Sequence, residues 1–374
     1  MKMFIEADSV ASKKMSGIGH TTLEILNALD RKIVNQKLQV TAIVPYGTKK
    51  YVLKYGWKNI KVRQLPPGYK YVNYALVRTS LPIPVDLLFG RGVYVFPNYK
   101  NWFVPFSRSI TFIHDVVFKL HPETTHDKNL VYLNDNFPRW VKRTDGVVSI
   151  SNQSAREVAA VFPSVKDKIE TIYLGVNKAT YFPREKKEIA DTLTKYGIED
   201  DYFLAVGNIE PRKNILKLLE AYKLYADNTT SAAQMVLIGG DGWKNKETLE
   251  YIENLTEKGY KVYRPKQYVE DEDLPMIYSG SRSLIHVAIH EGFGLPPVQA
   301  QACGAPVIVS DLAVFHETLS AVTATYVDYK NAQDIALAMQ LAPSVLNGRK
   351  SSLRKGFTWD DTVNRLIKFA GIIN

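Results

Sequence analysis

The sequence predicts an α/β protein built from two Rossmann-like, doubly wound domains that face each other across a ligand cleft. Three observations support this fold class. The chain has 374 residues, which is too long for one ordinary hydrophobic core. Short apolar runs alternate with helical patterns, as they do in βα units, and the alternation breaks off after Gly175 and then restarts. Glycine-rich turns follow several of the apolar runs, at the strand ends where doubly wound folds bind ligands.

The first half of the chain is expected to form an N-terminal domain over residues 1–178. Its apolar runs predict buried strands, and amphipathic patterns between them predict helices. The predicted strands are 2–7, 38–44, 93–96, 110–114 and 147–150, and the predicted helices are 18–34 and 152–162. We expect Ser151 to be the N-cap of the second helix, because its hydroxyl can accept a hydrogen bond from the first turn.

The second half repeats the pattern and is expected to form a C-terminal domain over residues 179–356. The predicted strands are 202–206, 235–238, 283–287 and 306–309, and the predicted helices are 214–226, 244–258, 271–278, 295–303 and 331–346. The acidic cluster 270–273 is interpreted as negative charge at the start of a helix, where the helix dipole favours it. A last segment, 357–374, contains an amphipathic helix at 359–373 that follows the completed second sheet.

The overall composition is typical of a globular, soluble protein of the cytosol. Hydrophobic residues make up 45% of the chain and charged residues 23%. No apolar run approaches the roughly 18 residues that a membrane-spanning helix needs. The single cysteine, Cys303, fits a reducing cytosol and lies among small residues, so we interpret it as a packing residue rather than a nucleophile.

Positive charge is concentrated in the first half of the chain. Residues 1–180 hold 26 Lys and Arg against 13 Asp and Glu, whereas residues 181–374 hold 22 against 25. Within 31–85 there is no acidic residue, while eleven Lys and Arg accompany seven aromatic residues: Tyr46, Tyr51, Tyr55, Trp57, Tyr69, Tyr71 and Tyr74. Cations mixed with such rings suit an anionic membrane surface at the inner face of the membrane. The alternative is a solvated basic face with its rings packed inward. Nucleic acid is not expected as a partner, because no binding module is recognisable.

The most informative motif is HEGFGLPPVQAQACGAPVIVSD, from His290 to Asp311. A glycine turn that opens a helix presents free N–H groups and a positive dipole end, which suit a phosphate. Here those groups belong to Phe293, Gly294 and Leu295. Glu291 comes just before the turn, where its carboxylate can reach hydroxyls attached to the bound anion. The motif therefore predicts a site for a sugar joined to a phosphate.

A second motif, VGNIEPRKNI, follows the predicted strand 202–206. It brings the cations of Arg212 and Lys213 to the end of that strand, where two positive charges favour a diphosphate. The alternative is a pair of surface charges at a helix start, which the helix dipole disfavours.

Two further glycine turns offer close backbone approach to a ligand. Gly17 and Gly19 lie in the first βα connection, and Gly240 follows the predicted strand 235–238. The first turn is not a dinucleotide fingerprint, because position 22, where that motif needs its third glycine, is Thr22.

His114 ends the predicted strand 110–114 and is followed by Asp115. A histidine at a strand end is placed to meet a ligand, but a hydrogen-bonded core histidine is the equally open alternative.

Taken together, these segments resemble the GT-B glycosyltransferases of the large retaining family 4, also called glycosyltransferase group 1. The resemblance covers nearly the whole chain, in order. It includes SGIGHTTLEILNAL, TFIHDVVFKLHPE, VSISNQSAREVA, TIYLGVNKATYF, VGNIEPRKNILKLLEAY, LPMIYSGSRSLIHVAIHEGFGLPPVQAQACGAPVIVSD and FTWDDTVNRL. The longest of these motifs and VGNIEPRKN are the most specific.

The resemblance implies a role for each candidate residue. Arg212 and Lys213 would neutralise the diphosphate leaving group, Glu291 would hold ring hydroxyls of the donor sugar, and His114 would lie near the anomeric centre. Backbone N–H groups at Gly17, Gly19 and 293–295 would contact the donor. The family usually needs no metal and no protein general base, and its final helix crosses back to the N-terminal domain.

The implied function is retaining transfer of a sugar from a nucleotide-diphosphate-sugar donor to a lipid-linked or glycan acceptor in cell-surface polysaccharide or glycoconjugate assembly. The chain departs from the family pattern at Gln299. The pattern E-x7-E would place a second glutamate there, which normally binds the nucleotide ribose. This departure motivates an alternative, a non-catalytic GT-B partner subunit.

Overall fold

The computed structural model describes residues 1–12, 15–33, 38–69, 71–72, 82–99, 101–343 and 349–373. Contacts divide the chain into two compact units. The N-terminal unit comprises Met1–Val116, Val131–Gly175 and Thr358–Asn374, and the C-terminal unit comprises Val117–Leu130 and Val176–Phe357. The chain therefore passes four times from one unit to the other.

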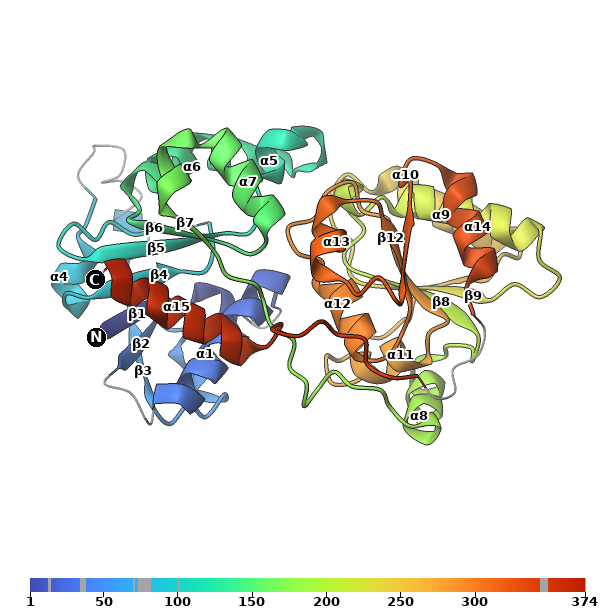
Figure 1. The fold of residues 1–374 in the computed structure, drawn as a ribbon, viewed down its shortest axis with the longest axis horizontal. Coiled ribbons are helices and arrows are strands. Elements are labelled where there is room, and N and C mark those ends of the chain that lie inside the picture. The colour runs from blue at the N-terminus through green and yellow to red at the C-terminus, as the bar shows by residue number, and fades with distance from the viewer. Residues whose placement is uncertain are drawn as a thin grey trace. The chain divides into compact units, whose positions relative to one another are not determined.

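The N-terminal unit is built on a seven-stranded, wholly parallel sheet (Figure 1). Its strands are β1 (Lys2–Glu6), β2 (Gln39–Val44), β3 (Ile60–Gln64), β4 (Val93–Phe96), β5 (Arg108–Ile113), β6 (Gly146–Ser149) and β7 (Ile169–Thr171). They lie in the order β3-β2-β1-β4-β5-β6-β7. The order reverses between β1 and β4, and the carboxyl ends at such a point are where doubly wound sheets bind ligands.

Helices cover this sheet. They are α1 (Gly17–Lys32), α2 (Lys49–Leu53), α4 (Val85–Phe89), most of α6 (Asp127–Arg143), α7 (Asn152–Val161) and α15 (Trp359–Ile373), with short 3-10 turns at Asp8–Val10 and Pro163–Lys168. Figure 1 shows α15 beside α1, where Arg31 and Lys32 contact Asp360 and Asn364. As predicted, Ser151 caps α7, and its hydroxyl accepts a hydrogen bond from the Ser154 N–H at 3.0 Å.

The C-terminal unit repeats the same topology with six parallel strands. They are β8 (Tyr202–Val206), β9 (Gln234–Ile238), β10 (Val262–Tyr263), β11 (Ser283–His286), β12 (Val307–Ser310) and β13 (Ala324–Val327), in the order β10-β9-β8-β11-β12-β13. The order reverses between β8 and β11. The segments that follow these two strands are therefore the expected ligand-binding segments of this unit.

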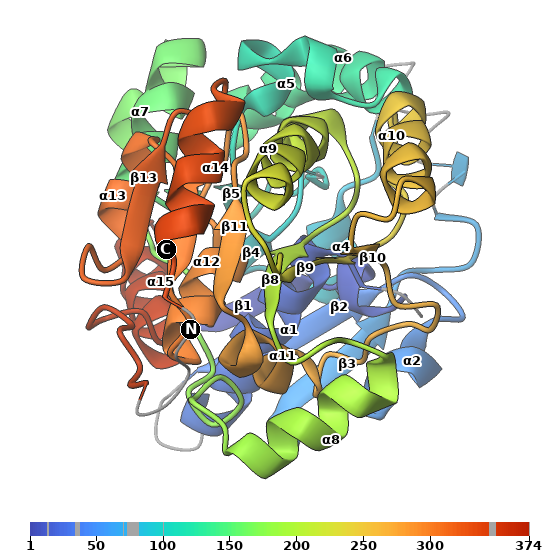
Figure 2. The same cartoon turned by 90° about the vertical axis from the view of Figure 1, so that its right-hand side faces the viewer.

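The helices of this unit enclose its sheet. They are α5 (Val117–Leu120), α8 (Lys186–Tyr196), α9 (Ile215–Asp227), α10 (Lys246–Glu257), α11 (Leu274–Gly280), α12 (Leu295–Ala302), α13 (Ala313–Thr318) and α14 (Ala332–Leu341), with the 3-10 turns η3 (Pro122–Thr124) and η5 (Pro211–Lys213). Figure 2 shows α9 and α14 side by side. Leu219 and Tyr222 on α9 and Ile335 and Met339 on α14 are fully buried in one core cluster.

These two Rossmann-like sheets confirm the predicted fold class. All nine predicted strands are present, with ends that differ from the prediction by at most two residues. Four strands were not predicted, β3, β7, β10 and β13, and each of them is an edge strand of its sheet. Predicted helical residues at 34 and 344–346 lie outside the described residues.

Candidate active site

The turn after β8 brings two cations together in the C-terminal unit. Pro211 opens the 3-10 turn η5, which also contains Arg212 and Lys213 and ends at Asn214. Asn214 has the left-handed φ of 56°, and its side-chain amide donates to the carbonyls of Val287 and Tyr329 at 3.1 and 2.8 Å. Asparagine tolerates this conformation better than most residues. The left-handed residue separates η5 from α9, so the two cations are not part of the first turn of α9.

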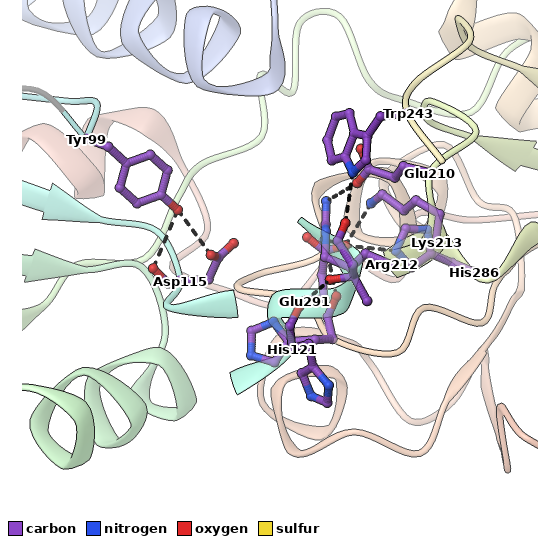
Figure 3. Close-up of polar contacts among 11 residues, drawn as sticks. Tyr99, Asp115, His121, Glu210, Arg212, Lys213, Trp243, His286 and Glu291 are labelled. Atoms are coloured by element: carbon purple, nitrogen blue, oxygen red, sulfur yellow. Dashed lines mark hydrogen bonds and ion pairs between the residues drawn. The ribbon is translucent and has the colours of Figure 1, made fainter. Parts of the chain in front are cut away.

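Glu291 lies at the centre of a polar cluster formed by the segments after β8 and β11. Its Oε2 atom is 2.8 Å from the Lys213 ammonium, 3.1 Å from the Arg212 guanidinium and 3.1 Å from Nε2 of His286. Figure 3 shows the three side chains directed at the carboxylate. This part of the structure thus brings together three residues that the sequence singled out, and adds His286.

Arg212 links this cluster to a second carboxylate. Its guanidinium donates to Glu210 Oε1 at 2.8 Å and to the His290 carbonyl at 3.1 Å. The side chains of Lys213, Arg212, Glu210 and Glu291 are only 12%, 18%, 6% and 14% exposed. Two carboxylates therefore balance two cations in surroundings that screen charge weakly, where each pairing is stronger than at the surface.

The surroundings of the cluster shift the pKa values of three of its members. Burial alone would raise the pKa of Glu291, but the charges of Lys213 and Arg212 outweigh it and hold that pKa well below its usual value. Burial lowers the pKa of Lys213, against the attraction of Glu291. Burial and the Lys213 charge lower the pKa of His286 to about 4. His286 is therefore neutral at pH 7, and its Nε2–H donates to the carboxylate.

The two oxygens of Glu291 differ in their surroundings. Oε2 receives all three hydrogen bonds of the cluster, from Lys213, Arg212 and His286. Within the described part of the chain, Oε1 receives none, and the side chain keeps 14% of its surface exposed. A carboxylate oxygen held in this way is an acceptor fixed in position for a hydroxyl of a ligand.

The turn after Glu291 offers backbone donors next to the carboxylate. Gly294 is the N-cap of α12 and has a φ of +83°, and a Cβ atom there would come within 2.5 Å of the Phe315 ring. Only glycine fits both constraints. The next residues include Pro296 and Pro297, which have no N–H. The N–H groups of Phe293, Gly294 and Leu295 donate to no residue within the described ranges, so they are the donors that this helix start presents.

Gln299, one turn further along α12, has a defined partner. The buried Tyr278 hydroxyl donates to its Oε1 at 3.3 Å. Burial raises the pKa of Tyr278 well above its usual value, so the hydroxyl keeps its proton and remains a donor. The contact orients the amide of Gln299 and leaves its NH2 group as a donor.

Gly240 lies in the loop after β9. Its N–H donates to Asn208 Oδ1 at 3.2 Å. The preceding residue, Gly239, approaches β8 so closely that a Cβ atom there would lie 2.0 Å from the Gly207 carbonyl. The lack of a side chain at Gly239 lets the ends of two neighbouring strands pack closely, and this role does not require a ligand.

Gly17 and Gly19 open α1 in the N-terminal unit. The Gly19 N–H donates to the Ser16 hydroxyl at 3.3 Å, so this group caps the helix. A Cβ atom on Gly19 would lie 2.8 Å from the Ser9 carbonyl, whereas one on Gly17 would meet nothing within 4 Å. Gly19 thus has a packing role in the described structure, while Gly17 remains open.

His114 also lies in the N-terminal unit, directly after β5. It is buried, and its Nε2 is 2.7 Å from the Pro97 carbonyl, which identifies Nε2 as the protonated nitrogen. Burial lowers the pKa of His114, so the ring is neutral at pH 7. The Pro97 contact is the hydrogen bond of a core histidine, and it leaves Nδ1 as the acceptor atom of the ring.

Sequence reasoning missed Glu210 and His286. Glu210 stands inside the quoted motif VGNIEPRKNI, two residues before Arg212, but its acidic side chain was not singled out. His286 ends the run SLIH as His114 ends ITFIH. The same signal, a polar residue at a strand's carboxyl end, could have identified it.

The described residues contain no group of three or more His, Cys, Asp or Glu side chains that could hold a metal ion. The sequence does contain one Asp-x-Asp pattern, at Asp271 and Asp273. The Asp273 carboxylate is engaged by the Lys195 ammonium and the Tyr196 hydroxyl, both at 2.6 Å. Asp273 is the residue that precedes α11, as the interpretation of the acidic cluster 270–273 expects.

Comparison with known families identifies the C-terminal part of the chain. Residues 188–348, which include the whole Glu291 cluster, match the family model described as "Glycosyl transferases group 1". This part of the chain is therefore similar to the group 1 glycosyltransferases.

Curated proteins that are similar to this chain include bacterial mannosyltransferases. The chain is 31% identical to O-antigen chain mannosyltransferase B of Escherichia coli over 222 residues, which cover 59% of this chain and 58% of the relative. It is 29% identical to O-antigen chain mannosyltransferase RfbU of Salmonella typhimurium over 241 residues, which cover 64% of this chain and 62% of the relative. These matches span about three fifths of the relatives' own length.

Solved structures match this chain over its full length. Anabaena HepE in complex with UDP and glucose has a TM-score of 0.73 at 15% identity, and the match covers 100% of both chains. WaaG, a glycosyltransferase involved in lipopolysaccharide biosynthesis, has a TM-score of 0.67 at 14% identity with the same coverage. At these identities the likeness establishes the fold, which is GT-B.

Proposed function

We propose that the protein is a retaining, metal-independent glycosyltransferase that moves a hexose from a nucleoside-diphosphate-sugar donor. The observation that carries the proposal is the geometry of Glu291. Lys213, Arg212 and His286 hold its Oε2 atom, while Oε1 is left to accept a hydroxyl. A fixed carboxylate acceptor beside two cations suits a ligand that has sugar hydroxyls and a diphosphate close together.

The same residues can stabilise the negative charge of the diphosphate as it leaves the sugar. Negative charge grows on the leaving oxygen as the bond to the sugar breaks, and donors fixed beforehand stabilise that charge most. The Lys213 ammonium has N–H groups beyond the one that binds Glu291, the Arg212 charge lies beside it, and the N–H groups of 293–295 lie at the start of α12. Glu210 and Glu291 keep both cations ionised and oriented before the donor binds.

We assign the donor to the predicted C-terminal domain, residues 179–356, and the acceptor to the predicted N-terminal domain, residues 1–178, with 357–374 as a returning helix. In this assignment His114 and the Gly17 turn contact the transferred sugar, and Gln299 contacts the nucleotide ribose. The Gln299 amide, oriented by Tyr278, would meet a ribose hydroxyl without the negative charge that a glutamate brings.

We propose mannose as the transferred sugar and a lipid-linked or growing glycan as the acceptor, in assembly of a cell-surface polysaccharide. Support comes from the relatives, which are named as O-antigen chain mannosyltransferases. The base of the donor nucleotide is left open. The HepE structure holds UDP together with glucose, not with mannose, so it does not indicate which base accompanies mannose here.

A panel of nucleoside-diphosphate sugars tests this function. Each donor is incubated with the protein, with and without a mannan or lipid-linked acceptor, and release of the nucleoside diphosphate is measured. GDP-mannose and UDP-mannose are expected to be consumed faster than the glucose donors. The anomeric configuration of the product, measured by NMR, is expected to match that of the donor. Inversion would refute the retaining mechanism.

The alternative, a non-catalytic partner subunit, predicts a different result from the same panel. A partner subunit would bind a donor and gain thermal stability without releasing nucleoside diphosphate. The Gln299 departure is what favours this alternative, so Gln299→Glu is included in the panel. Release of nucleoside diphosphate by the wild-type protein rules the alternative out.

We further propose that the protein is cytoplasmic and binds the inner face of the membrane through the α2 face, defined as Tyr46, Lys49, Lys50, Leu53 and Lys54. Tyr46 and Leu53 are 61% and 59% exposed, and the three lysines are exposed around them. Apolar side chains among cations suit a surface of anionic lipid headgroups. Among the described residues, no helix is both long and apolar enough to cross a membrane.

Some of the other aromatic residues of 31–85 are buried or partly buried instead of exposed. Tyr69 is buried, and Trp57 is partly buried and donates to Asn27 at 2.8 Å, so these rings follow the inward-packing alternative. Tyr71 is 80% exposed, and Tyr74 lies outside the described residues.

Vesicle sedimentation tests the α2 face. Vesicles that contain phosphatidylglycerol are expected to sediment the protein at low salt, and pure phosphatidylcholine vesicles are not. Combined replacement of Lys49, Lys50 and Lys54 by Ala should weaken binding by about 3 kcal/mol, at roughly 1 kcal/mol for each cation. The matched control replaces three exposed lysines of the C-terminal unit, Lys246, Lys258 and Lys266. Equal loss in both variants, or no binding by the wild type, would contradict the proposal.

A further inference from the structure

Two residues of the loop between β9 and α10 form hydrogen bonds with one short segment of the C-terminal unit. The Trp243 Nε1–H donates to the Thr124 carbonyl at 2.8 Å. The Lys244 ammonium donates to the carbonyls of Glu123 and Thr125, both at 3.1 Å, and is 2.8 Å from Asp127 Oδ1. Three consecutive carbonyls are thus bound by two consecutive residues.

The segment bound by these two residues is Val117–Leu130. It comes from the first half of the sequence but belongs to the C-terminal unit. The carbonyls that Lys244 binds lie at the end of η3, where unpaired carbonyls carry the negative end of the turn's dipole. A cation is favourable there. The ring of His126 adds an edge contact to Trp243, with ring centroids 6.2 Å apart.

The backbone of Lys244 is held in an unfavourable conformation. Its φ is +50°, and among the described non-glycine residues only Asn214 shares a positive φ. For a residue with a long side chain this conformation is sterically unfavourable. Backbone strain of this kind persists where the surrounding contacts require it. Here those contacts are the two hydrogen bonds and the ion pair of the Lys244 ammonium.

The 117–130 segment contacts the loop that carries Glu291. It carries His121, whose ring centroid lies 5.8 Å from that of His290. His290 precedes Glu291 in the chain, and its carbonyl accepts a hydrogen bond from Arg212. Figure 3 shows Trp243 and His121 together with the cluster residues.

We propose that Trp243 and Lys244 form a clasp that positions His121 against His290 and thereby makes the 117–130 segment part of the donor site. In this role both are positioning residues, which act through His121 and His290 rather than by touching the donor. The clasp lies on the loop that also carries Gly240. Donor occupancy and the position of the segment are therefore coupled, and each stabilises the other.

The kinetic part of this inference rests on the proposed transferase function, but the exchange part does not. Hydrogen–deuterium exchange of 117–130 is measured in the full-length protein, free and with saturating GDP or UDP as the probe. The test variant combines Trp243→Phe, which keeps the ring and removes the N–H, with Lys244→Met, which keeps the length and removes the charge. Lys246→Met is the matched control, because its side chain is 90% exposed and pairs with Glu250 on the same helix.

In the free wild-type protein we expect slow exchange in 117–130 that becomes at least tenfold faster in the clasp variant, with β8, β11 and α12 unchanged. The nucleotide is expected to slow exchange in 117–130 further in the wild type and in the control, but not in the clasp variant. With a donor found by the panel, the clasp variant should raise the donor KM about tenfold and leave kcat nearly unchanged.

A purely structural role gives a different pattern, in which exchange rises across the whole C-terminal unit and the melting temperature falls with it. That result would overturn the proposal. So would a clasp variant in which 117–130 exchanges as slowly as it does in the wild type. If GDP and UDP do not bind and no donor is consumed, the proposed function fails. The exchange of the free protein still decides whether the clasp holds the segment.

Discussion

At the level of single residues, the candidate site depends on one carboxylate that has two tasks. Glu291 neutralises Lys213 and Arg212 through Oε2 and offers Oε1 to a ligand. Removing one partner of a buried ion pair leaves the other charges uncompensated, which costs about 3–5 kcal/mol. Glu291→Ala therefore disturbs folding as well as function, and a variant of the same shape is the better probe.

Glu291→Gln is expected to lower kcat/KM for the donor by about 10- to 100-fold. A hydrogen bond to a charged group contributes about 1.5–3 kcal/mol. The amide of the variant can still accept a hydrogen bond from the sugar, but without the charge that strengthens it. Steady-state kinetics checks the value, and urea denaturation measures how much stability is lost alongside. Unchanged kinetics in a folded variant would remove Glu291 from the site.

His286 makes stability depend on pH. Its pKa in the folded protein is about 4, below the value near 6.5 of an unfolded histidine. Between these values the unfolded chain binds the proton and the folded protein does not, so stability is complete above pH 6.5 and is lost as pH falls toward 4. The loss is at most about 3 kcal/mol. Urea denaturation between pH 7 and pH 4.5 should show it, with a shallower slope in His286→Gln.

Gln299→Glu is expected to preserve or tighten nucleotide binding. The Tyr278 hydroxyl is protonated and can donate to a carboxylate as well as to the amide oxygen, so the local contact is kept. The added charge strengthens a hydrogen bond from a ribose hydroxyl. Calorimetric titration with GDP and UDP measures the change. A large loss of affinity would mean that the amide NH2 is itself the group that binds the nucleotide.

At the level of elements, the interior of each sheet was predictable and its edges were not. The predicted strands are the inner ones, whose residues are buried on both faces and form continuous apolar runs. The four unpredicted strands are the edges, and they are short or alternate between buried and exposed residues. In β3, the sequence IKVRQ mixes two cations into the strand, so no apolar run marks it.

The candidate site was predictable in its parts but not in its pairings. The motifs identified Arg212, Lys213 and Glu291 as polar residues at strand ends. Nothing local indicates that one carboxylate oxygen binds both cations, because 78 residues separate Lys213 from Glu291. That contact follows from β8 and β11 being neighbours at the point where the strand order reverses. Topology, rather than local pattern, decides which strand ends meet.

The turn between η5 and α9 offers a test at this level. Asn214 has φ 56° and binds two carbonyls, so Asn214→Ala adds strain and loses both hydrogen bonds. We expect a loss of about 2–4 kcal/mol in the free energy of unfolding. Asn214→Gly keeps the conformation and should lose less. Urea denaturation of both variants separates the two effects, and equal losses would show that the φ angle is unimportant.

At the level of the whole molecule, the sequence order and the structural units do not coincide. The N-terminal unit takes its last helix, α15, from the end of the chain, and the C-terminal unit takes Val117–Leu130 from the first half. Each unit is therefore completed by a segment from the other half of the sequence. In α15, Trp359, Val363, Leu366 and Ala370 are buried, and Phe369 packs within 2.8 Å of the position that a Cβ on Gly146 would take.

We propose that the Glu291 cluster of the C-terminal unit binds the diphosphate of a nucleotide sugar. Calorimetric titration of GDP and UDP into the wild type, Lys213→Met and Lys223→Met tests it most directly. Lys223 is the control, since it also pairs with a carboxylate but lies exposed on α9. We expect one of the two nucleotides to bind the wild type and Lys223→Met with equal affinity, and to bind Lys213→Met at least tenfold more weakly. Equal affinity in all three proteins, or no binding of either nucleotide, would contradict it.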